Sequence, residues 1–327
     1  MLSRLTQQDY FAIILGMARP EYPKDLRGFR RRFATDDACV EYLIQCRWPD
    51  GFVCPKCSGK IGTRMSTRPL IQCRSCRYQA SAMAGTTMHR SKIPIQDWFA
   101  AAYHVTTFTP GISALQLQRQ LGLRSHDTAW YLLHRLRKGM VSDTRSQITG
   151  LVEADETFIG GPAKGKRGRG AGHKSLVVGA VEVLVYEDKK GKRCERAGRL
   201  RLALIPDATE ESLGAFLAEN VKPKSRIRTD GWTGYSDAAL EDFIHHVRIV
   251  GSPQRAHKQF PHIHKVFGNL KTWLNGTHHG VNHKYLPSYL DEFVFRFNRR
   301  QTPMAAFQTL LGISLQKKPL TLERLRS

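Results

Sequence analysis

The chain has 327 residues, of which 41% are hydrophobic and 24% are charged. This ordinary globular composition excludes global disorder, a collagen and a disulfide scaffold, and the length suggests about two or three domains. The 51 lysines and arginines outnumber the 28 aspartates and glutamates, so the formal net charge is +23. Such an excess attracts polyanions and favours nucleic-acid binding over the alternative of a merely basic surface.

The N-terminal region contains the longest apolar run near that end, at residues 11–18. This run falls far short of the ~20 residues that a membrane-spanning helix requires. It also lacks the basic leader and the small-residue cleavage site of a signal peptide. We therefore expect no membrane partner and a cytoplasmic location, where thiols stay reduced.

Four of the cysteines form a metal-binding pattern. Cys54 and Cys57 make one C-x-x-C pair, Cys73 and Cys76 make a second, and fifteen residues separate the pairs. This spacing is typical of a structural Zn²⁺ site in which four thiolates leave no open position for catalysis. The pattern predicts a zinc ribbon over residues 51–82, with redox dithiols or chance cysteines as the alternative.

Residues 83–148 are expected to form a helical DNA-binding region. Within them, a periodic stretch at residues 113–121 is broken by Gly122 and resumes at Ser125. A helix, a glycine-containing turn and a second helix make the layout of a helix-turn-helix, although an ordinary helical hairpin is the alternative. The second helix carries three cations that we predict to be available to DNA: Arg135, Arg137 and Lys138.

After Gly150 the periodicity becomes that of a mixed α/β layer. Three strands are predicted from alternating or apolar runs at residues 151–161, 175–187 and 199–206. A helix follows with Thr209 as its N-cap, and then a short strand that ends at Asp230. Two further helices are expected at residues 260–275 and 284–300.

Two carboxylates of this layer point to a divalent cation. Asp155 lies in the first strand on the same face as Glu153, and Asp230 ends a later strand just before Gly231. Strand ends beside glycine are where α/β sheets present polar groups to ligands. Two such carboxylates suit Mg²⁺ and metal-assisted phosphodiester chemistry. Spacing alone leaves open that they are two exposed acids at strand ends.

A basic segment follows the strand of Asp155 directly. Residues 164–174 contain five lysines and arginines, four glycines and no acid, so they cannot pack a core. We predict an arm that grips phosphate, with a solvated loop as the alternative. Its cations are Lys164, Lys166, Arg167, Arg169 and Lys174.

These motifs together resemble those of the bacterial zinc-ribbon insertion-sequence transposases of the DDE class. The resemblance covers nearly the whole chain and is carried by CPKC with CRSC, VEADETFIGG, RTDGW, and the stretch that runs from NLKTW to FNRR. It implies an RNase H-like nuclease fold, two catalytic Mg²⁺ or Mn²⁺ ions, and DNA strand transfer. Because two DNA ends must be paired, it also implies a homodimer or a higher oligomer.

The resemblance assigns four catalytic residues. Asp155 matches the first acid, and Asp230 matches the second. The family's common third acid lies seven residues before a lysine, here Lys271, but that position holds His264. The chain is thus similar to the ISXO2-like branch with a D-D-H-K set, in which His264 is a neutral metal ligand and Lys271 binds phosphate. Helical spacing puts both on one face, and a buried histidine is the alternative for His264.

The expected function is that of a DNA transposase acting in the cytoplasm on the nucleoid. It would bind the terminal repeats of an insertion sequence, cleave a strand by metal-assisted hydrolysis and join the 3′-OH to target DNA. The alternatives are a DNA-binding regulator with an inactive nuclease domain and a structure-specific nuclease without strand transfer. The expected domains are an N-terminal helical segment (1–50), the zinc ribbon (51–82), the helical region (83–148), the RNase H-like catalytic domain (149–300) and a C-terminal tail (301–327).

Overall fold

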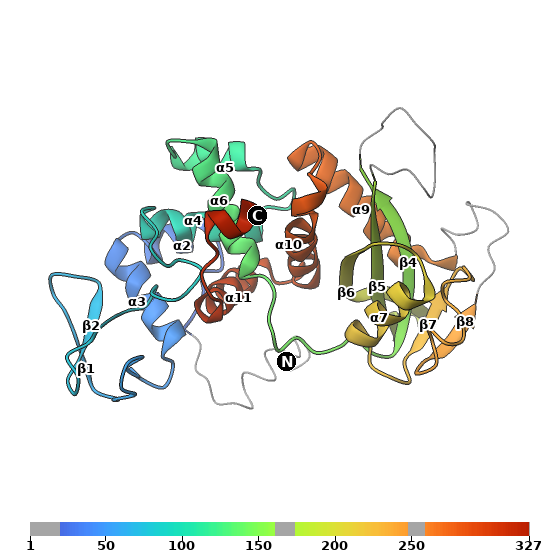
Figure 1. The fold of residues 1–327 in the computed structure, drawn as a ribbon, viewed down its shortest axis with the longest axis horizontal. Coiled ribbons are helices and arrows are strands. Elements are labelled where there is room, and N and C mark those ends of the chain that lie inside the picture. Colours follow the sequence, from blue (N-terminus) through green and yellow to red (C-terminus); the bar gives the residue numbers. More distant parts are fainter. Residues whose placement is uncertain (1–19, 161–173, 248–258, 327) are drawn as a thin grey trace. The chain divides into compact units, whose positions relative to one another are not determined.

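The computed structural model describes residues 20–160, 174–247 and 259–326. The chain divides into two compact units, shown in Figure 1. One unit consists of residues 1–140 and 301–327 and is called the helical unit below. The other consists of residues 141–300 and is called the sheet unit.

The helices of the helical unit include the two helices of the predicted helix-turn-helix. Thr35 accepts a hydrogen bond from the Ala38 amide at 3.2 Å and so begins the helix at Asp36. Gly122 adopts the left-handed conformation, with φ +62°, between the two helices of the predicted helix-turn-helix. The helices are α2 (Leu26–Arg32), α3 (Asp36–Arg47), α4 (Ile95–Thr107), α5 (Ala114–Leu121), α6 (His126–Lys138), α11 (Pro303–Gln316) and α12 (Leu322–Arg326).

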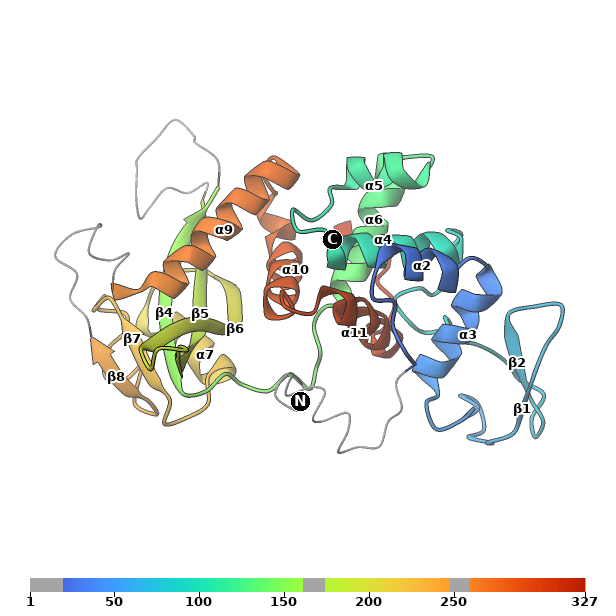
Figure 2. The same cartoon turned by 180° about the vertical axis from the view of Figure 1, so that it is seen from behind.

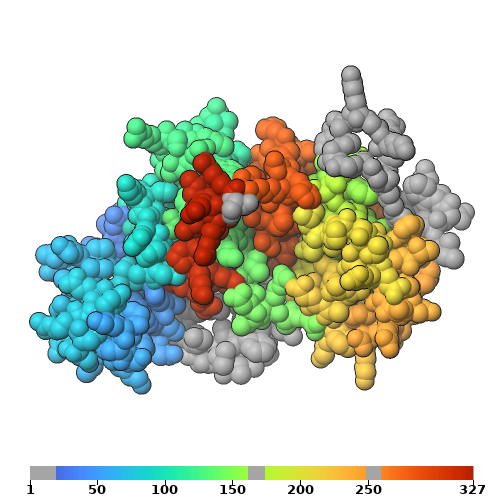
Figure 3. All heavy atoms as spheres, in the orientation of Figure 1, coloured from blue at the N-terminus to red at the C-terminus, as the bar shows by residue number. Residues whose placement is uncertain are grey.

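The C-terminal residues do not form the expected tail. Phe307 of α11 is fully buried, and its ring lies 5.7 Å from that of Phe29 and 5.8 Å from that of Phe99. The apolar face of α11 therefore completes the aromatic core of the helical unit. The following segment, red in Figure 3, reaches α6, where the Tyr131 hydroxyl donates to the Leu320 carbonyl.

A small antiparallel sheet carries the paired cysteines. Its strands run in the order β1 (Gly62–Arg64), β2 (Leu70–Cys73) and β3 (Gln79–Ser81). Arg47 at the end of α3 donates to the carbonyl oxygens of Ser81, Ala82 and Ala84, at 2.9, 2.7 and 2.8 Å. One guanidinium thus fastens the end of this sheet to the helical core.

The sheet unit contains the predicted mixed sheet with one additional strand. Its strands are ordered β6 (Arg193–Ile205), β5 (Ser175–Glu187), β4 (Leu151–Ile159), β7 (Arg226–Thr229) and β8 (Ile244–Val247). The β5 strand is antiparallel to both of its neighbours, β6 and β4, whereas β7 is parallel to both β4 and β8. The edge strand β8 was not predicted, because Ile244 and Val247 are about half exposed and give no alternating apolar signal. The β6 strand also begins before the predicted boundary at residue 199.

Helices cover both faces of this sheet. The helix α7 (Glu210–Asn220) packs on one face, and Thr209 caps it as predicted by accepting from the Ser212 amide. The opposite face, seen in Figure 2, packs against α9 (Pro261–His278) and α10 (Leu286–Asn298), which the short η1 (His283–Tyr285) joins. This architecture confirms the expected RNase H-like α/β layer.

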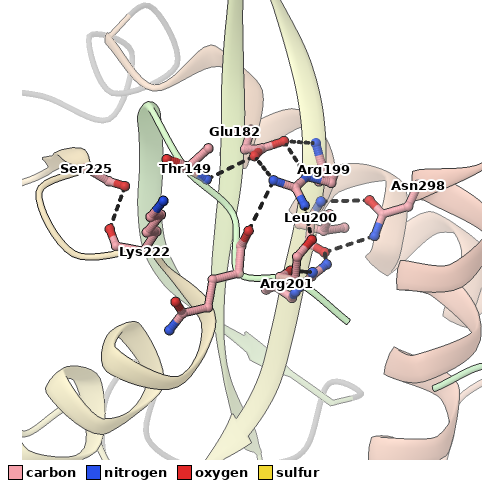
Figure 4. A network of polar contacts seen from close by, with 10 residues as sticks. Thr149, Glu182, Arg199, Leu200, Arg201, Lys222, Ser225 and Asn298 are labelled. Carbon is pink, nitrogen blue, oxygen red and sulfur yellow. Dashed lines mark hydrogen bonds and ion pairs between the residues drawn. The ribbon is translucent and has the colours of Figure 1, made fainter. Parts of the chain in front are cut away.

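A buried carboxylate anchors the long β5–β6 hairpin, as Figure 4 shows. Glu182 of β5 accepts from the Arg199 guanidinium at 2.9 Å and from the Thr149 amide at 3.0 Å. Burial raises the pKa of Glu182, but these bonds outweigh it and hold the pKa below its ordinary value. On the same hairpin, the Asn298 side chain of α10 bonds both the amide and the carbonyl of Leu200, at 2.7 and 3.1 Å.

Candidate functional site

The two aspartates of the predicted site come from β4 and from the end of its parallel neighbour β7. The parallel pair of β4 and β7 sets Glu153 opposite Arg228. This paired stretch ends before Asp230, which immediately follows β7, while Asp155 lies two residues beyond Glu153 in β4. One oxygen of Asp230 accepts from the Trp232 amide at 3.0 Å, which fixes the carboxylate at the start of the next turn.

A buried tyrosine lies near three carboxylates of this region. The Tyr235 side chain is almost fully buried, and its hydroxyl donates to Glu156 at 3.2 Å. Burial raises the pKa of Tyr235 well above its ordinary value, and the charges of Glu156, Asp155 and Asp230 raise it further. The phenol therefore stays protonated beside three carboxylates. No feature of the sequence had pointed to Tyr235.

The predicted histidine reaches the same place from the helix α9. The Nε2 atom of His264 lies 3.5 Å from an oxygen of Asp155, and the two side chains are 23% and 15% exposed. Both are therefore within reach of solvent and of a bound ligand. A carboxylate and an imidazole at this distance can share a divalent cation such as Mn²⁺ or Mg²⁺. The ligand atoms of Asp155, Asp230 and His264 do not all lie within 4.8 Å of one another.

Lys271 lies two helical turns after His264 and also faces β4. Its ammonium group donates to the Thr157 hydroxyl at 2.7 Å. Partial desolvation lowers the pKa of Lys271, while the nearby negative charge of Asp155 raises it. Lys271 and Lys174 both line a hollow of ≈ 240 Å³ beside the end of β4. The hollow therefore offers two cations, of which Lys271 lies near Asp155.

A glycine allows α9 to approach the sheet this closely. Gly179 of β5 is the register partner of Asp155. A Cβ at this position would lie 2.9 Å from the Ile263 side chain and 3.0 Å from that of Phe267, both on α9. The absence of a side chain at Gly179 thus sets the spacing between α9 and the strands. Sequence reasoning missed this residue, because a glycine inside a strand indicates a close approach without naming its partner.

A second group with metal-binding atoms lies next to this site. The carboxylates of Glu153 and Glu195 and the imidazole of His262 place one ligand atom each within 4.8 Å of one another. However, the Arg228 guanidinium bonds both oxygens of Glu195, at 3.0 and 3.1 Å, and lies 3.8 Å from Glu153. A positive charge already occupies this group, which therefore favours an ion-pair cluster over a metal site.

The four predicted zinc ligands converge at the start of the small sheet. Their sulfur atoms lie within 4.8 Å of one another, with Cys54 3.6 Å from Cys76 and Cys57 3.6 Å from Cys73. In a tetrahedron with Zn–S bonds of about 2.3 Å, neighbouring sulfurs are ~3.8 Å apart. The cluster therefore has the geometry of a structural zinc site.

Two of the predicted DNA contacts are wrong. Arg135 and Arg137 are 5% and 1% exposed, so they lie inside the helical unit. The Arg135 guanidinium donates to the backbone carbonyls of Thr87 and His89 and stacks on the Trp98 ring. These partners satisfy the buried charge, and both arginines are withdrawn from any surface that DNA could reach.

The remaining predicted cations include some that the structure describes and others that lie outside the described residues. Lys138 is exposed, and Lys174 lines the hollow beside Lys271. The other cations of the predicted arm lie outside the described residues: Lys164, Lys166, Arg167 and Arg169.

Comparison with known proteins finds two matching transposase domain families and one relative. Residues 147–298 match the family model of the ISXO2-like transposase domain, and residues 34–79 match that of the transposase zinc-ribbon domain. An uncharacterized protein in the transposable element ISH50 of Halobacterium salinarum is 23% identical over 301 residues. The match covers 87% of this chain and 99% of that protein. Among the described residues, no helix has the length and apolarity needed to cross a membrane.

Proposed function

Because this chain belongs to the zinc-ribbon insertion-sequence transposases with an ISXO2-like domain, we propose that it cleaves DNA at element ends and joins the freed 3′-OH to target DNA. The observation that carries the proposal is the 3.5 Å approach of His264 to Asp155, with Lys271 of the same helix also near Asp155. Acids and an imidazole alone would suit many metal sites. The adjoining cations favour a substrate that is itself a polyanion.

Asp155, Asp230 and His264 would hold the catalytic ions, which we propose to be two Mg²⁺ or Mn²⁺. Such ions would supply an activated water and charge stabilisation for the leaving 3′ oxygen. Lys271 would bind a phosphate next to the scissile one, and its bond to Thr157 would aim the ammonium group. The same carboxylates would then serve the attack of the 3′-OH on target DNA.

Recognition of the element ends would fall to the helical unit. We propose that the zinc ribbon and the α5–α6 pair bind the terminal repeats, with Lys138 among the contacts. The net charge of +23 supports tight and salt-dependent binding. The basic arm at residues 164–174 would grip the DNA near the site. We further propose a homodimer or higher oligomer that pairs two ends on nucleoid DNA in the cytoplasm.

The test is to incubate the full chain with a duplex that carries its element's end, a second plasmid, and Mg²⁺ or Mn²⁺. We expect a nick at the element end and a product joined to the plasmid. Asp155→Asn and Asp230→Asn should each lower cleavage by at least about a hundred-fold and leave DNA binding intact. Asp242→Asn, at an exposed position of the same unit, is the matched control and should cleave normally.

The same assay separates the alternatives. Nicking without any joined product would support a nuclease, and binding without nicking would support a regulator. Either result with active wild-type preparations would contradict strand transfer. Cleavage by Asp155→Asn at the wild-type rate would show that the reacting site lies elsewhere.

A further inference from the structure

The N-cap residue of α9 provides no side-chain hydrogen bond to the first turn of the helix. The residue at its N-cap is Phe260, whose side chain contains no hydrogen-bonding atom, and the helix then begins with Pro261. The first amides of a helix have no partners within the helix and need an acceptor. Here the acceptor comes from a distant strand. One oxygen of Glu153 accepts from the His262 amide at 2.9 Å and from the Ile263 amide at 3.0 Å.

Glu153 is a buried carboxyl group whose pKa burial raises above its ordinary value, while the two amide bonds and the charge of Arg228 counteract that rise. It lies in the middle of β4 and is completely buried. A carboxylate at the N-terminus of a helix satisfies the free amides and interacts favourably with the helix dipole. Its second oxygen lies 3.8 Å from the Arg228 guanidinium, which is itself held by Glu195. The carboxylate is thus kept in place from both sides.

The cap sits directly next to the reacting site. Glu153 and Asp155 point to the same face of β4, because they are two residues apart in a strand. The capped amide of His262 and the side chain of His264 both belong to the N-terminal part of α9. The bonds from Glu153 to the first turn of α9 therefore lie beside the 3.5 Å approach of His264 to Asp155. A helix held at this point cannot slide along β4 without breaking both bonds.

We propose that Glu153 is a positioning residue. By capping α9 from strand β4, it holds His264 close enough to Asp155 for both side chains to bind the same metal ion. The hydrogen bonds are direct evidence for the capping. Its consequence for metal binding rests on the proposed function. Partners that orient metal ligands typically change metal affinity by about ten- to a hundred-fold when they are removed. We expect an effect of this size at the catalytic ions.

Two measurements on the zinc-loaded full chain test the proposal. Hydrogen–deuterium exchange of peptides covering residues 260–267 reports the cap, and calorimetric titration with Mn²⁺ reports the position of His264. Glu153→Ala should speed exchange in this peptide and weaken Mn²⁺ binding by about ten-fold or more. Glu153→Gln keeps an acceptor oxygen, so it should stay close to the wild type in both.

The matched control removes another buried carboxylate. Glu182 is 5% exposed and holds the β5–β6 hairpin through Arg199, without a bond to α9 among the described residues. Glu182→Ala should lower the melting temperature but leave both the 260–267 exchange and the Mn²⁺ affinity unchanged. A role of Glu153 in general stability alone would make the two alanine variants behave alike.

The outcomes are separable. Unchanged Mn²⁺ affinity in Glu153→Ala, beside a wild type that binds Mn²⁺, overturns the positioning role. A Glu153→Gln variant as impaired as Glu153→Ala overturns the capping mechanism, because the accepted bonds would then not matter. If Glu153→Ala does not fold, Glu153→Asp, which retracts the acceptor, should show the same loss relative to Glu153→Gln. A wild type that neither binds Mn²⁺ nor nicks DNA contradicts the proposed function, while faster exchange in the variant still establishes the cap.

Discussion

The cysteine cluster and the carboxylate–histidine site bring metal-binding atoms together in different ways. The four cysteines come from two turns of one short segment that also forms a three-stranded sheet. Their sulfur atoms lie within 4.8 Å of one another. Asp155, Asp230 and His264 come from β4, the end of β7 and α9, which are far apart in the chain. Turn geometry alone accounts for the first site, whereas the second exists only once a sheet and a helix have packed.

The two regions also differ in what keeps them folded. Few apolar side chains are buried in the small sheet, with Ile71 and Ala80 among them, so its stability must come largely from the metal. The sheet unit has a hydrophobic core on each face of its five strands. Its fold should therefore be independent of the catalytic ions. Four variants or treatments test this difference, from the largest expected effect to the smallest.

Removal of zinc should have the largest effect. Zinc binding to a structural site of this kind is worth about 10 kcal/mol or more of folding free energy, so a chelator should unfold residues 51–82. Metal analysis of the reduced native protein should find one zinc per chain. Exchange of peptides from the sheet unit should stay slow after chelation and serves as the internal control. A ribbon that remains protected without zinc would contradict the comparison.

Loss of the histidine should disable the second site without unfolding it. His264→Ala should lower cleavage by at least about a hundred-fold and leave the melting temperature nearly unchanged. Because imidazole suits softer ions, Mn²⁺ should support wild-type cleavage better than Mg²⁺ at equal concentration, and His264→Glu should reduce that preference. His246→Ala, at an exposed histidine of β8, is the control. Equal metal preference in the wild type and His264→Glu would argue against a ligand role.

A methyl group at Gly179 should disturb the site through packing. Its Cβ would meet the Ile263 and Leu202 side chains at 2.9 Å, so Gly179→Ala should destabilise the protein by about 1–3 kcal/mol. The shift of α9 should also lower cleavage. Gly268→Ala is the matched control, since its Cβ would meet no atom of the described residues within 4 Å. It should be neutral or raise stability by about 0.5–1 kcal/mol, as measured by chemical denaturation.

Lys271→Ala should have the smallest effect of the four. Lys271 contacts phosphate in the proposed function, so its loss should raise the KM for DNA by about ten-fold and reduce the salt dependence of binding by about one unit of slope. The kcat should change little. Lys265→Ala, at an exposed position of the same helix, should leave the KM nearly unchanged. A large fall in kcat would instead place Lys271 among the groups that act in the transition state.

Much of the layer that positions the site could be predicted from periodicity. The β5 strand was placed correctly at both ends, because its apolar run is continuous and bounded by turn residues. The β8 strand and the role of α11 could not be predicted. An exposed edge strand has no apolar pattern, and nothing local in an amphipathic C-terminal helix tells which earlier helices it will cover.

Arg135 is a case in which a prediction from the sequence was wrong because of how the side chain packs. Its place in a basic helix beside Lys138 indicates a surface contact with DNA. The fold instead brings the carbonyls of Thr87 and His89 and the ring of Trp98 around its guanidinium. A long side chain with several donors can be buried wherever enough acceptors converge, and that convergence is a property of the packed structure.

The sequence by itself determined the cysteine cluster, the positions of the main strands along the chain and the resemblance to a transposase family, because these depend on patterns within short segments. Only the tertiary structure decided that His264 lies 3.5 Å from Asp155, that Gly179 admits α9, and that Glu153 caps this helix. Each of these facts is a meeting of residues from different elements. Their distances follow from strand register and helix packing, and neither is encoded in the separation of residues along the chain.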